Sequence, residues 1–132
     1  MREARETQSV EEIAGRRIVL SAGYGKTNLE DLEWMMETVL NRAGAWKEEG
    51  WAYIADCTRM IPVGPQEIGQ LVKMTKAFVA AGCKAFGFAE GKSFILGIQT
   101  KMNTQMSETG VIEGHFATVD EVLAWLQKDL NI

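Results

Sequence analysis

The sequence predicts an α/β fold, in which a mixed, mostly parallel sheet of four to five strands packs against four helices. Two observations carry this prediction. Short apolar runs alternate with longer amphipathic segments in the order ββαβαβαβα, and such alternation produces parallel strands joined by helical crossovers. The chain has 132 residues, only two prolines and no repeated or linker-like stretch, so we expect one domain over residues 1–132.

Five segments are the predicted strands. The first two are separated only by Ala14-Gly15-Arg16, so they form an antiparallel hairpin that makes the sheet mixed. Each later strand follows a helix-length segment, as parallel pairing requires. The predicted strands are residues 6–13, 17–22, 51–56, 84–89 and 113–117.

Three helices have clear start signals. The segments 27–30 and 118–121 are capping boxes, in which Thr27 or Thr118 accepts a free backbone N–H and a glutamate reaches back. Pro65 suits the first turn of the second helix, and Gly82 is a natural stop after it. The expected inner face of the first helix is Leu29, Leu32, Met35 or Met36, Val39, Leu40 and Ala43. That of the second helix is Ile68, Leu71, Val72, Phe78 and Val79, and that of the last helix is Val122, Leu123, Trp125 and Leu126.

A further helix is predicted between the second and the last, over residues 93–109. Phe94, Ile95, Ile98, Met102 and Met106 fit one face of it, although Gly97 costs about 1 kcal/mol relative to alanine. The alternative is a hairpin that pairs residues 85–89 with 93–99 around the turn 90–92. The apolar spacing continues to residue 106 and stops at Gly110, which favours the helix.

Charge and composition exclude several classes of protein. Eighteen acidic and fourteen basic residues give a net charge of −4, so we expect no nucleic-acid partner. No apolar run approaches the roughly 18 residues of a membrane span, and no leader pattern is present, so the expected location is cytoplasmic. Cys57 and Cys83 lie near apolar runs and are expected to be buried free thiols, while a disulfide between them stays open.

Three stretches resemble the STAS domain, and most closely its SpoIIAA-like branch of anti-sigma-factor antagonists. Residues 51–56 (WAYIAD) resemble the central strand of that family, which ends in an acidic residue. Residues 82–88 resemble the glycine at a helix end and the next strand, and residues 114–126 resemble the closing strand and helix. The resemblance implies a SpoIIAA-like (STAS) fold that is also similar to lipid-binding Sec14 domains.

The chain departs from this family at the start of the second helix. The antagonists carry a phosphorylatable serine there, whereas residues 60–65 (MIPVGP) contain no hydroxyl group, and the nearest one upstream is Thr58. Phosphorylation would add about two negative charges at a helix N-terminus, and this sequence has no acceptor for them in that segment.

Two Gly-Lys-hydroxyl triplets, at residues 25–27 and 91–93, are partial matches to a phosphate-binding loop. Each follows a predicted strand and opens a predicted helix, but Leu20 and Phe86 stand where the motif needs its first glycine. We therefore expect no tight ATP or GTP binding and no cofactor. Weak anion contact at Lys92 and Ser93 is compatible with a helix N-terminus.

Catalytic and metal-binding signals are weak. His115 is the only histidine, and nothing near it in the sequence predicts an oriented base, so we expect no catalytic residues. One histidine and two separated cysteines lack metal-ligand spacing, so we expect no metal. An enzyme that uses Cys57 or His115 is the least favoured class.

The candidate binding surface is the segment 56–65, at the carboxyl end of the predicted central strand. Ligands of parallel α/β sheets gather at this edge, and the resemblance places the partner-facing surface there. The candidate residues are Asp56, Thr58, Arg59, Met60, Ile61, Val63, Gly64 and Pro65. A stiff connector in which Asp56 bonds the following residues and Met60 and Ile61 cap the core is the alternative.

Two functions stay open on this evidence. The leading hypothesis is a noncatalytic regulatory module with a protein partner, such as a regulatory kinase or an anti-sigma-like factor. The alternative is a carrier of a small apolar, lipid-like ligand. Consecutive Trp34, Met35 and Met36 cannot all face inward on one helix, so some apolar surface should be exposed or cover a ligand. The oligomeric state has no sequence signal.

The missing hydroxyl gives a first prediction. Incubation of the protein with a serine kinase of the antagonist family, followed by peptide mapping, should find no phosphate on residues 58–65. Phosphate on any residue of this segment would contradict the prediction. Thr58 is the residue to watch, because it carries the hydroxyl nearest to the start of the second helix.

Overall fold

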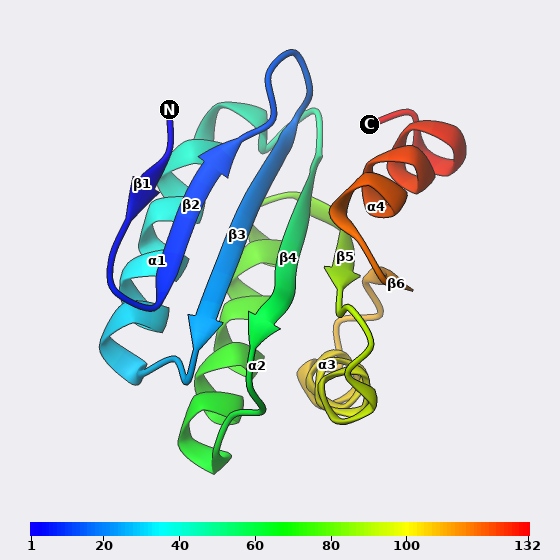
Figure 1. Ribbon diagram of the computed structural model, residues 1–132. Coiled ribbons are helices and arrows are strands. Elements are labelled where there is room, and N and C mark those ends of the chain that lie inside the picture. Colours follow the sequence, from blue (N-terminus) through cyan, green and yellow to red (C-terminus); the bar gives the residue numbers. More distant parts are fainter.

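Six strands form one mixed sheet in the order β1-β2-β3-β4-β5-β6 (Figure 1). The computed structural model describes residues 1–132, apart from the side chains of Phe94, Ile95, Met102 and Thr104. The mixed α/β sheet is as predicted, but its six strands exceed the four to five expected, because a two-residue β1 adds to the edge. The strands are β1 (Glu3–Ala4), β2 (Gln8–Glu12), β3 (Ile18–Gly25), β4 (Trp51–Met60), β5 (Cys83–Ala89) and β6 (Ile112–Phe116).

The predicted hairpin is present, and the rest of the sheet is parallel. β1, β2 and β3 pair antiparallel, whereas β3, β4, β5 and β6 pair parallel. Successive right-handed crossovers in one direction place their helices on the same face of a sheet. Figure 1 shows α1 and α2 behind the sheet and α4 in front of it.

Four helices follow strands β3 to β6. They are α1 (Leu29–Ala43), α2 (Pro65–Ala80), α3 (Phe94–Ser107) and α4 (Val119–Trp125). A short 3-10 turn (Gly44–Trp46) follows α1, and a π-helical turn (Leu126–Leu130) follows α4. The third predicted helix therefore forms, and the alternative hairpin over residues 85–99 does not.

The caps agree with the sequence at three helices and differ at one. The hydroxyls of Ser93 and Thr118 accept the backbone N–H groups of Leu96 and Glu121, and Pro65 is the first residue of α2. At α1 the cap is Asn28, whose Oδ1 accepts the N–H of Asp31 at 2.8 Å, and not Thr27. Thr27 is buried instead, because its hydroxyl bonds the side chains of Thr7 and Gln8 across the sheet edge.

Two apolar layers lie on the two faces of the sheet. Behind it, Tyr53 packs edge-on against Phe78 of α2 and Phe86 of β5, with ring centroids 4.9 and 5.1 Å apart. In front of it, Val122 and Leu126 bury the alternate residues of β3, β4 and β5. The period-2 pattern of the strands thus supplies both layers from one sheet.

The inner face of α3 differs from the prediction. Ile98 and Met106, expected to face the core, are 44% and 51% exposed, while the predicted inward positions of Phe94, Ile95 and Met102 lie outside the described side chains. Leu96, Asn103 and Ser107 are buried instead. The apolar pattern was misleading here, because this helix presents polar side chains inward and each buried polar group needs a specific partner.

Gly82 ends the connection from α2 to β5 in a conformation that only glycine adopts easily. Its φ is +97°, and a Cβ atom at this position would lie 2.4 Å from the carbonyl oxygen of Lys47. The predicted glycine stop therefore also allows the close approach between this turn and the segment after α1.

Asp31 ties the N-terminal strands to the first turn of α1. It is only 3% exposed, and its carboxylate accepts hydrogen bonds from the hydroxyl and the N–H of Thr7 and from Nε of Arg5, at 2.6, 3.0 and 2.7 Å. The bond from the Thr7 hydroxyl, reinforced by Arg5, lowers the pKa of Asp31 below its ordinary value of 3.8.

The lowered pKa of Asp31 makes the free energy of unfolding depend on pH in the acid range. A lowered folded-state pKa means that the stabilisation is complete above the ordinary value of 3.8 and is lost as the pH falls through the folded-state pKa. Asp31→Asn should lower the free energy of unfolding at neutral pH by about 1.5–3 kcal/mol, the contribution of hydrogen bonds to a charged group. Urea denaturation at several pH values should show this difference shrink below about pH 4.

Glu30→Gln is the matched control. Glu30 is the adjacent exposed acid and also bonds Arg5, at 2.7 Å, so its change should leave the midpoint of unfolding almost unmoved. If both variants lowered the free energy of unfolding equally, burial of Asp31 would not contribute to its stabilising effect.

Candidate functional site

Four of the predicted binding residues lie in β4, three of them beyond the strand end predicted at residue 56. β4 continues through Asp56, Thr58 and Arg59 to Met60, because β3 also continues past a register shift and pairs Tyr24 with Arg59 and Gly25 with Met60. The connection to α2 is therefore residues 61–64 only. The sequence showed the apolar part of the strand and could not show the partner that extends it.

Asp56 bonds its own neighbours. Its Oδ1 accepts the N–H and the hydroxyl of Thr58, at 3.0 and 2.6 Å. This arrangement agrees with the structural interpretation of Asp56 as an acidic group that bonds the residues after it. Asp56 also borders the apolar cavity described below.

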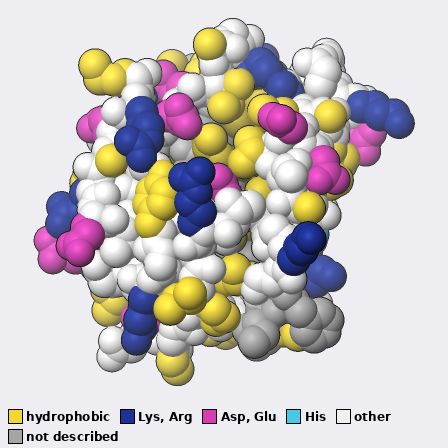
Figure 2. All heavy atoms as spheres, viewed as in Figure 1, with side chains coloured by type: hydrophobic (Ala, Val, Ile, Leu, Met, Phe, Trp, Pro, Cys, Tyr) yellow, Lys and Arg dark blue, Asp and Glu magenta, His cyan; other side chains and the backbone are white. Residues whose placement is uncertain are grey.

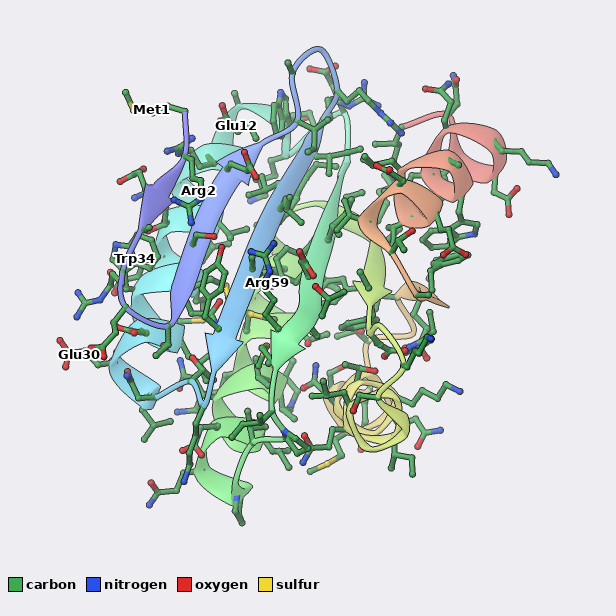
Figure 3. The ribbon with its side chains drawn as sticks, viewed as in Figure 1. Met1, Arg2, Glu12, Glu30, Trp34 and Arg59 are labelled. Carbon is green, nitrogen blue, oxygen red and sulfur yellow. The ribbon has the colours of Figure 1, made fainter. Side chains whose placement is uncertain are left out.

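Met60, Arg59 and Ile61 point in different directions at the end of β4. Met60 is half-buried and touches β3 so closely that a Cβ atom at Gly23 would lie 2.3 Å from its sulfur. Arg59 is exposed on the front of the sheet, with its guanidinium 5.8 Å from the ring centroid of Tyr24 (Figure 3). Ile61 is 50% exposed, and its N–H donates to the carbonyl of Gly25.

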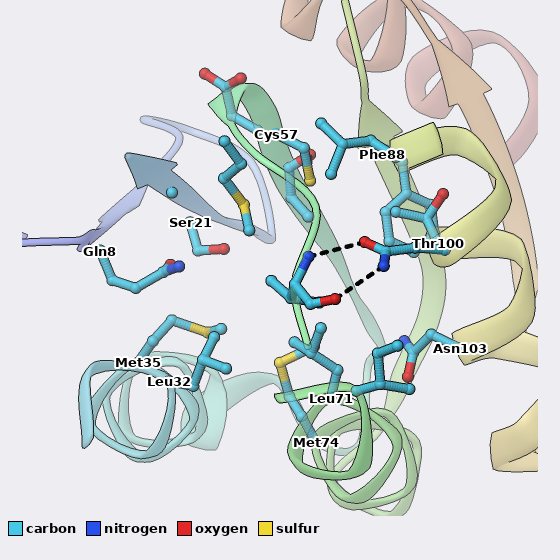
Figure 4. A pocket seen from close by; sticks show the side chains of 18 of the residues that line it. Gln8, Ser21, Leu32, Met35, Cys57, Leu71, Met74, Phe88, Thr100 and Asn103 are labelled. Carbon is cyan, nitrogen blue, oxygen red and sulfur yellow. Dashed lines mark hydrogen bonds between the residues drawn. The ribbon is translucent and has the colours of Figure 1, made fainter. Parts of the chain in front are cut away.

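A small cavity lies behind this segment, between the carboxyl ends of the strands and the first three helices (Figure 4). Its volume is about 60 Å³. Because one water molecule needs about 10–15 Å³ of such space, the cavity holds roughly four groups of that size. Its walls are mostly apolar and include the methionines at positions 35, 60 and 74.

The loop before α2 is bound to α3 by a pair of hydrogen bonds that no sequence pattern indicated. The Gln99 side-chain amide accepts the N–H of Val63 and donates to its carbonyl, both at 3.0 Å (dashed in Figure 4). Asn103, one turn along α3, donates to the hydroxyl of Thr75 on α2 at 3.0 Å. Its Oδ1 is buried without a partner among the described residues. Polar side chains of α3 therefore hold the segment 61–64 and α2 together.

Gly64 and Pro65, the last two predicted site residues, form the start of α2. The Glu67 carboxylate accepts the N–H of Gly64 at 3.1 Å, as in the second half of a capping box. Pro65 is exposed in the first turn. The segment therefore meets α2 in a fixed conformation.

The two Gly-Lys-hydroxyl triplets lie in turns after β3 and β5, the strands on either side of β4. Gly25-Lys26-Thr27 precedes α1, and Gly91-Lys92-Ser93 precedes α3. Lys92 is exposed, while the hydroxyl of Ser93 already accepts the N–H of Leu96 as the helix cap. A Cβ atom at Gly91 would lie 3.9 Å from Thr58, so the second turn borders β4.

His115 on β6 has partners that were missed in the sequence. Its Nδ1 lies 2.9 Å from Oε2 of Glu90, its Nε2 lies 3.1 Å from Oε2 of Glu113, and its ring stacks on Phe88. The Thr100 hydroxyl of α3 donates to the same oxygen of Glu90. Glu90 belongs to the segment 90–92, which the sequence suggested as a turn. It lies beside His115 because β5 pairs with β6. Because both ring nitrogens are engaged, the histidine is held as a structural link.

Neither cysteine is placed for nucleophilic chemistry. Both are buried and unpaired, as expected, and burial raises the pKa of each thiol to about 12. The described residues contain no group of three His, Cys, Asp or Glu side chains that could hold a metal ion. Within the same residues, no helix is both long and apolar enough to cross a membrane.

Comparison with known proteins identifies the fold. No protein-family model and no curated protein matches the sequence. The chain superimposes on the crystal structure of an uncharacterised protein of the DUF3478 family from Shewanella loihica PV-4, which has a SpoIIAA-like fold. The TM-score is 0.68 at 15% identity, over 94% of this chain and 98% of that chain. The SpoIIAA-like fold expected from the resemblance is therefore present, and this likeness extends to the fold alone.

Burial of the thiols predicts their reactivity. Only the thiolate form attacks an alkylating reagent. With a pKa of about 12, roughly one thiol in ten thousand is a thiolate at pH 8, and burial also limits access of the reagent. Iodoacetamide should leave Cys57 and Cys83 unmodified in the native protein and alkylate both in guanidinium chloride, as mass spectrometry can measure.

Thr58→Cys supplies the positive control, because position 58 is exposed one residue from buried Cys57 on the same strand. It should add a single thiol that reacts promptly in the native protein. Prompt labelling of the unmodified sequence would contradict the buried assignment.

Proposed function

We propose that this SpoIIAA-like domain is a noncatalytic regulatory module that binds a protein partner through the segment 56–65. The observation that carries the proposal is the exposed side chain of Ile61, whose backbone is held on both sides by hydrogen bonds. Ile61 is 50% exposed between β4, whose end is paired to β3, and Val63, which Gln99 holds at both its N–H and its carbonyl. A preorganised backbone loses little conformational entropy on association.

The absence of catalytic chemistry is part of the proposal. Among the described residues, the thiols are buried with raised pKa values, and both nitrogens of His115 are engaged by carboxylates. Neither these thiols nor this imidazole therefore forms a free nucleophile–base pair. These contacts support a binding role, because catalysis needs a nucleophile or base that can reach a substrate.

The partner class comes from the resemblance to anti-sigma-factor antagonists. It implies an anti-sigma-like factor or a regulatory kinase as the protein that binds this edge. Because residues 60–65 lack a hydroxyl, the association would not be switched by phosphate at the start of α2.

The carrier alternative has less support. A cavity of about 60 Å³ holds roughly four water-sized groups, far less than the 300 Å³ or more of common small-molecule pockets. An acyl chain would require α3 to separate from α2 and from the segment 61–64, with loss of the bonds made by Gln99 and Asn103.

Site-specific cross-linking tests the proposed function. A photoreactive amino acid at position 61 should trap a discrete protein in the native host, whereas the same group at position 112 should not. Ile112 is an equally matched control, because it is also 50% exposed but lies on the edge strand β6.

The double change Arg59→Glu with Met60→Ser then separates binding from stability. It should abolish the cross-link and weaken affinity for the trapped protein by about tenfold or more, while the thermal midpoint falls by less than about 4 °C. Earlier unfolding with unchanged binding by the folded fraction would make the segment structural. Equal trapping from positions 61 and 112 would contradict the assignment of this edge.

A further inference from the structure

Asn103 of α3 brings a polar atom without a partner to the wall of the apolar cavity. The residue lines the cavity and is only 5% exposed, and Figure 4 shows its amide directed from α3 toward Leu71 of α2. Its Nδ2 donates to the hydroxyl of Thr75 at 3.0 Å. Its Oδ1 is buried, and among the described residues no group donates to it.

The orientation of this amide is fixed by α2. The hydroxyl of Thr75 donates its own proton to the carbonyl of Leu71 at 3.0 Å, so toward Asn103 it can only accept. An amide turned by half a rotation would place two acceptors face to face. Nδ2 therefore stays on Thr75, and Oδ1 stays open as an acceptor.

An open acceptor at a cavity indicates an occupant that donates to it. Nearly all buried polar groups in proteins have a hydrogen-bond partner, and cavities that stay empty are lined by apolar groups alone. The volume of about 60 Å³ exceeds the space of about 10–15 Å³ that one water molecule needs. A single water on Oδ1 would therefore leave most of the cavity unfilled.

The other walls define the rest of the occupant. Polar side chains at the cavity have partners within the protein: Gln99 is bonded to Val63, and the hydroxyl of Ser21 to that of Tyr53. The remaining walls are mostly apolar and disfavour a charged group, and the carboxylate of Asp56 at the border repels an anion. The cavity thus suits a neutral molecule with an apolar body and one donor.

A molecule of this size has a short route to the cavity. Met60, Val63, Ile68 and Leu71 line it and are themselves half-buried, so single side chains separate it from solvent. Figure 2 shows hydrophobic side chains at the surface of the lower end of the molecule, where β3 and β4 end in Figure 1. Methionine side chains rotate easily, so entry does not require α3 to separate from α2 as an acyl chain would.

We propose that this cavity binds a neutral short-chain alcohol or amide of about four or five non-hydrogen atoms, whose O–H or N–H donates to Oδ1 of Asn103. The site goes beyond the proposed function and does not depend on it, because Ile61 is not among the residues that line the cavity. Trapping from position 61 decides the protein-binding role separately.

Titration with three small probes tests this site. Butan-1-ol and diethyl ether are isomers, but only the alcohol has a donor, and butylammonium replaces the hydroxyl with a charged donor. The methyl signals of isotope-labelled methionines report binding by NMR: Met35, Met60 and Met74 line the cavity, whereas Met106 is 51% exposed on α3 and serves as the internal control.

The expected result is that butan-1-ol shifts the three cavity methionines but not Met106, with a dissociation constant on the order of 1 mM or weaker for so few atoms. Diethyl ether should bind about fivefold more weakly, because it cannot satisfy the open acceptor. Butylammonium should bind about tenfold more weakly than the alcohol, because apolar walls do not solvate its charge.

Two variants then assign the preference to Asn103. Asn103→Leu removes the acceptor with little change in size, so the alcohol and the ether should bind with nearly equal affinity. Gln105→Leu is the matched control, because it makes the same kind of exchange at an exposed position of the same helix, and it should keep the fivefold difference. If Asn103→Leu does not fold, the two isomers still decide the question on the unmodified protein.

Several results would overturn the proposal. Absence of shifts at the three cavity methionines with every probe would mean that water alone occupies the cavity. Equal affinity for butan-1-ol and diethyl ether in the unmodified protein would show that no donor is selected. Tighter binding of butylammonium than of the alcohol would refute the neutral class, and an unchanged preference in folded Asn103→Leu would refute the role of Oδ1.

Discussion

The extended pairing of β3 with β4 is the constraint on which the candidate site depends. Past the register shift, Tyr24 lies beside Arg59 and Gly25 beside Met60, so β4 continues four residues beyond the strand end predicted at residue 56. The absence of a side chain at Gly23 allows Met60 to lie against β3 and border the cavity. Ile61 then leaves the sheet at a fixed position, because its N–H bonds the carbonyl of Gly25.

α3 connects the other parts of the site through polar contacts. Gln99 holds the loop before α2, Asn103 binds Thr75 of α2, and Thr100 donates to the carboxylate that also holds His115. Hydrogen bonds of this kind are directional, so they position the helix more specifically than apolar packing would. The segment 61–64 therefore has its conformation set from two sides, by β3 and by α3.

Fold and function have different support in this protein. Superposition on a SpoIIAA-like structure at 15% identity describes the arrangement of strands and helices, and a fold of this kind does not by itself specify an activity. The proposed function depends on local features, above all an exposed isoleucine on a backbone that β3 and α3 hold from two sides. Residues 60–65 lack the hydroxyl that the antagonists it resembles carry at this position, so the proposed function includes no phosphate switch there.

The sequence by itself determined the α/β order, the hairpin, the helix at residues 93–109 and the buried thiols, because period, caps and glycine stops act over a few neighbouring residues. It did not predict that Cys57 to Met60 are strand, that α3 presents polar residues inward, or that Glu90 meets His115. Each of these depends on pairing between segments distant in the chain. Only the tertiary structure decided which polar groups found partners, because hydrogen bonds require atoms to meet in space.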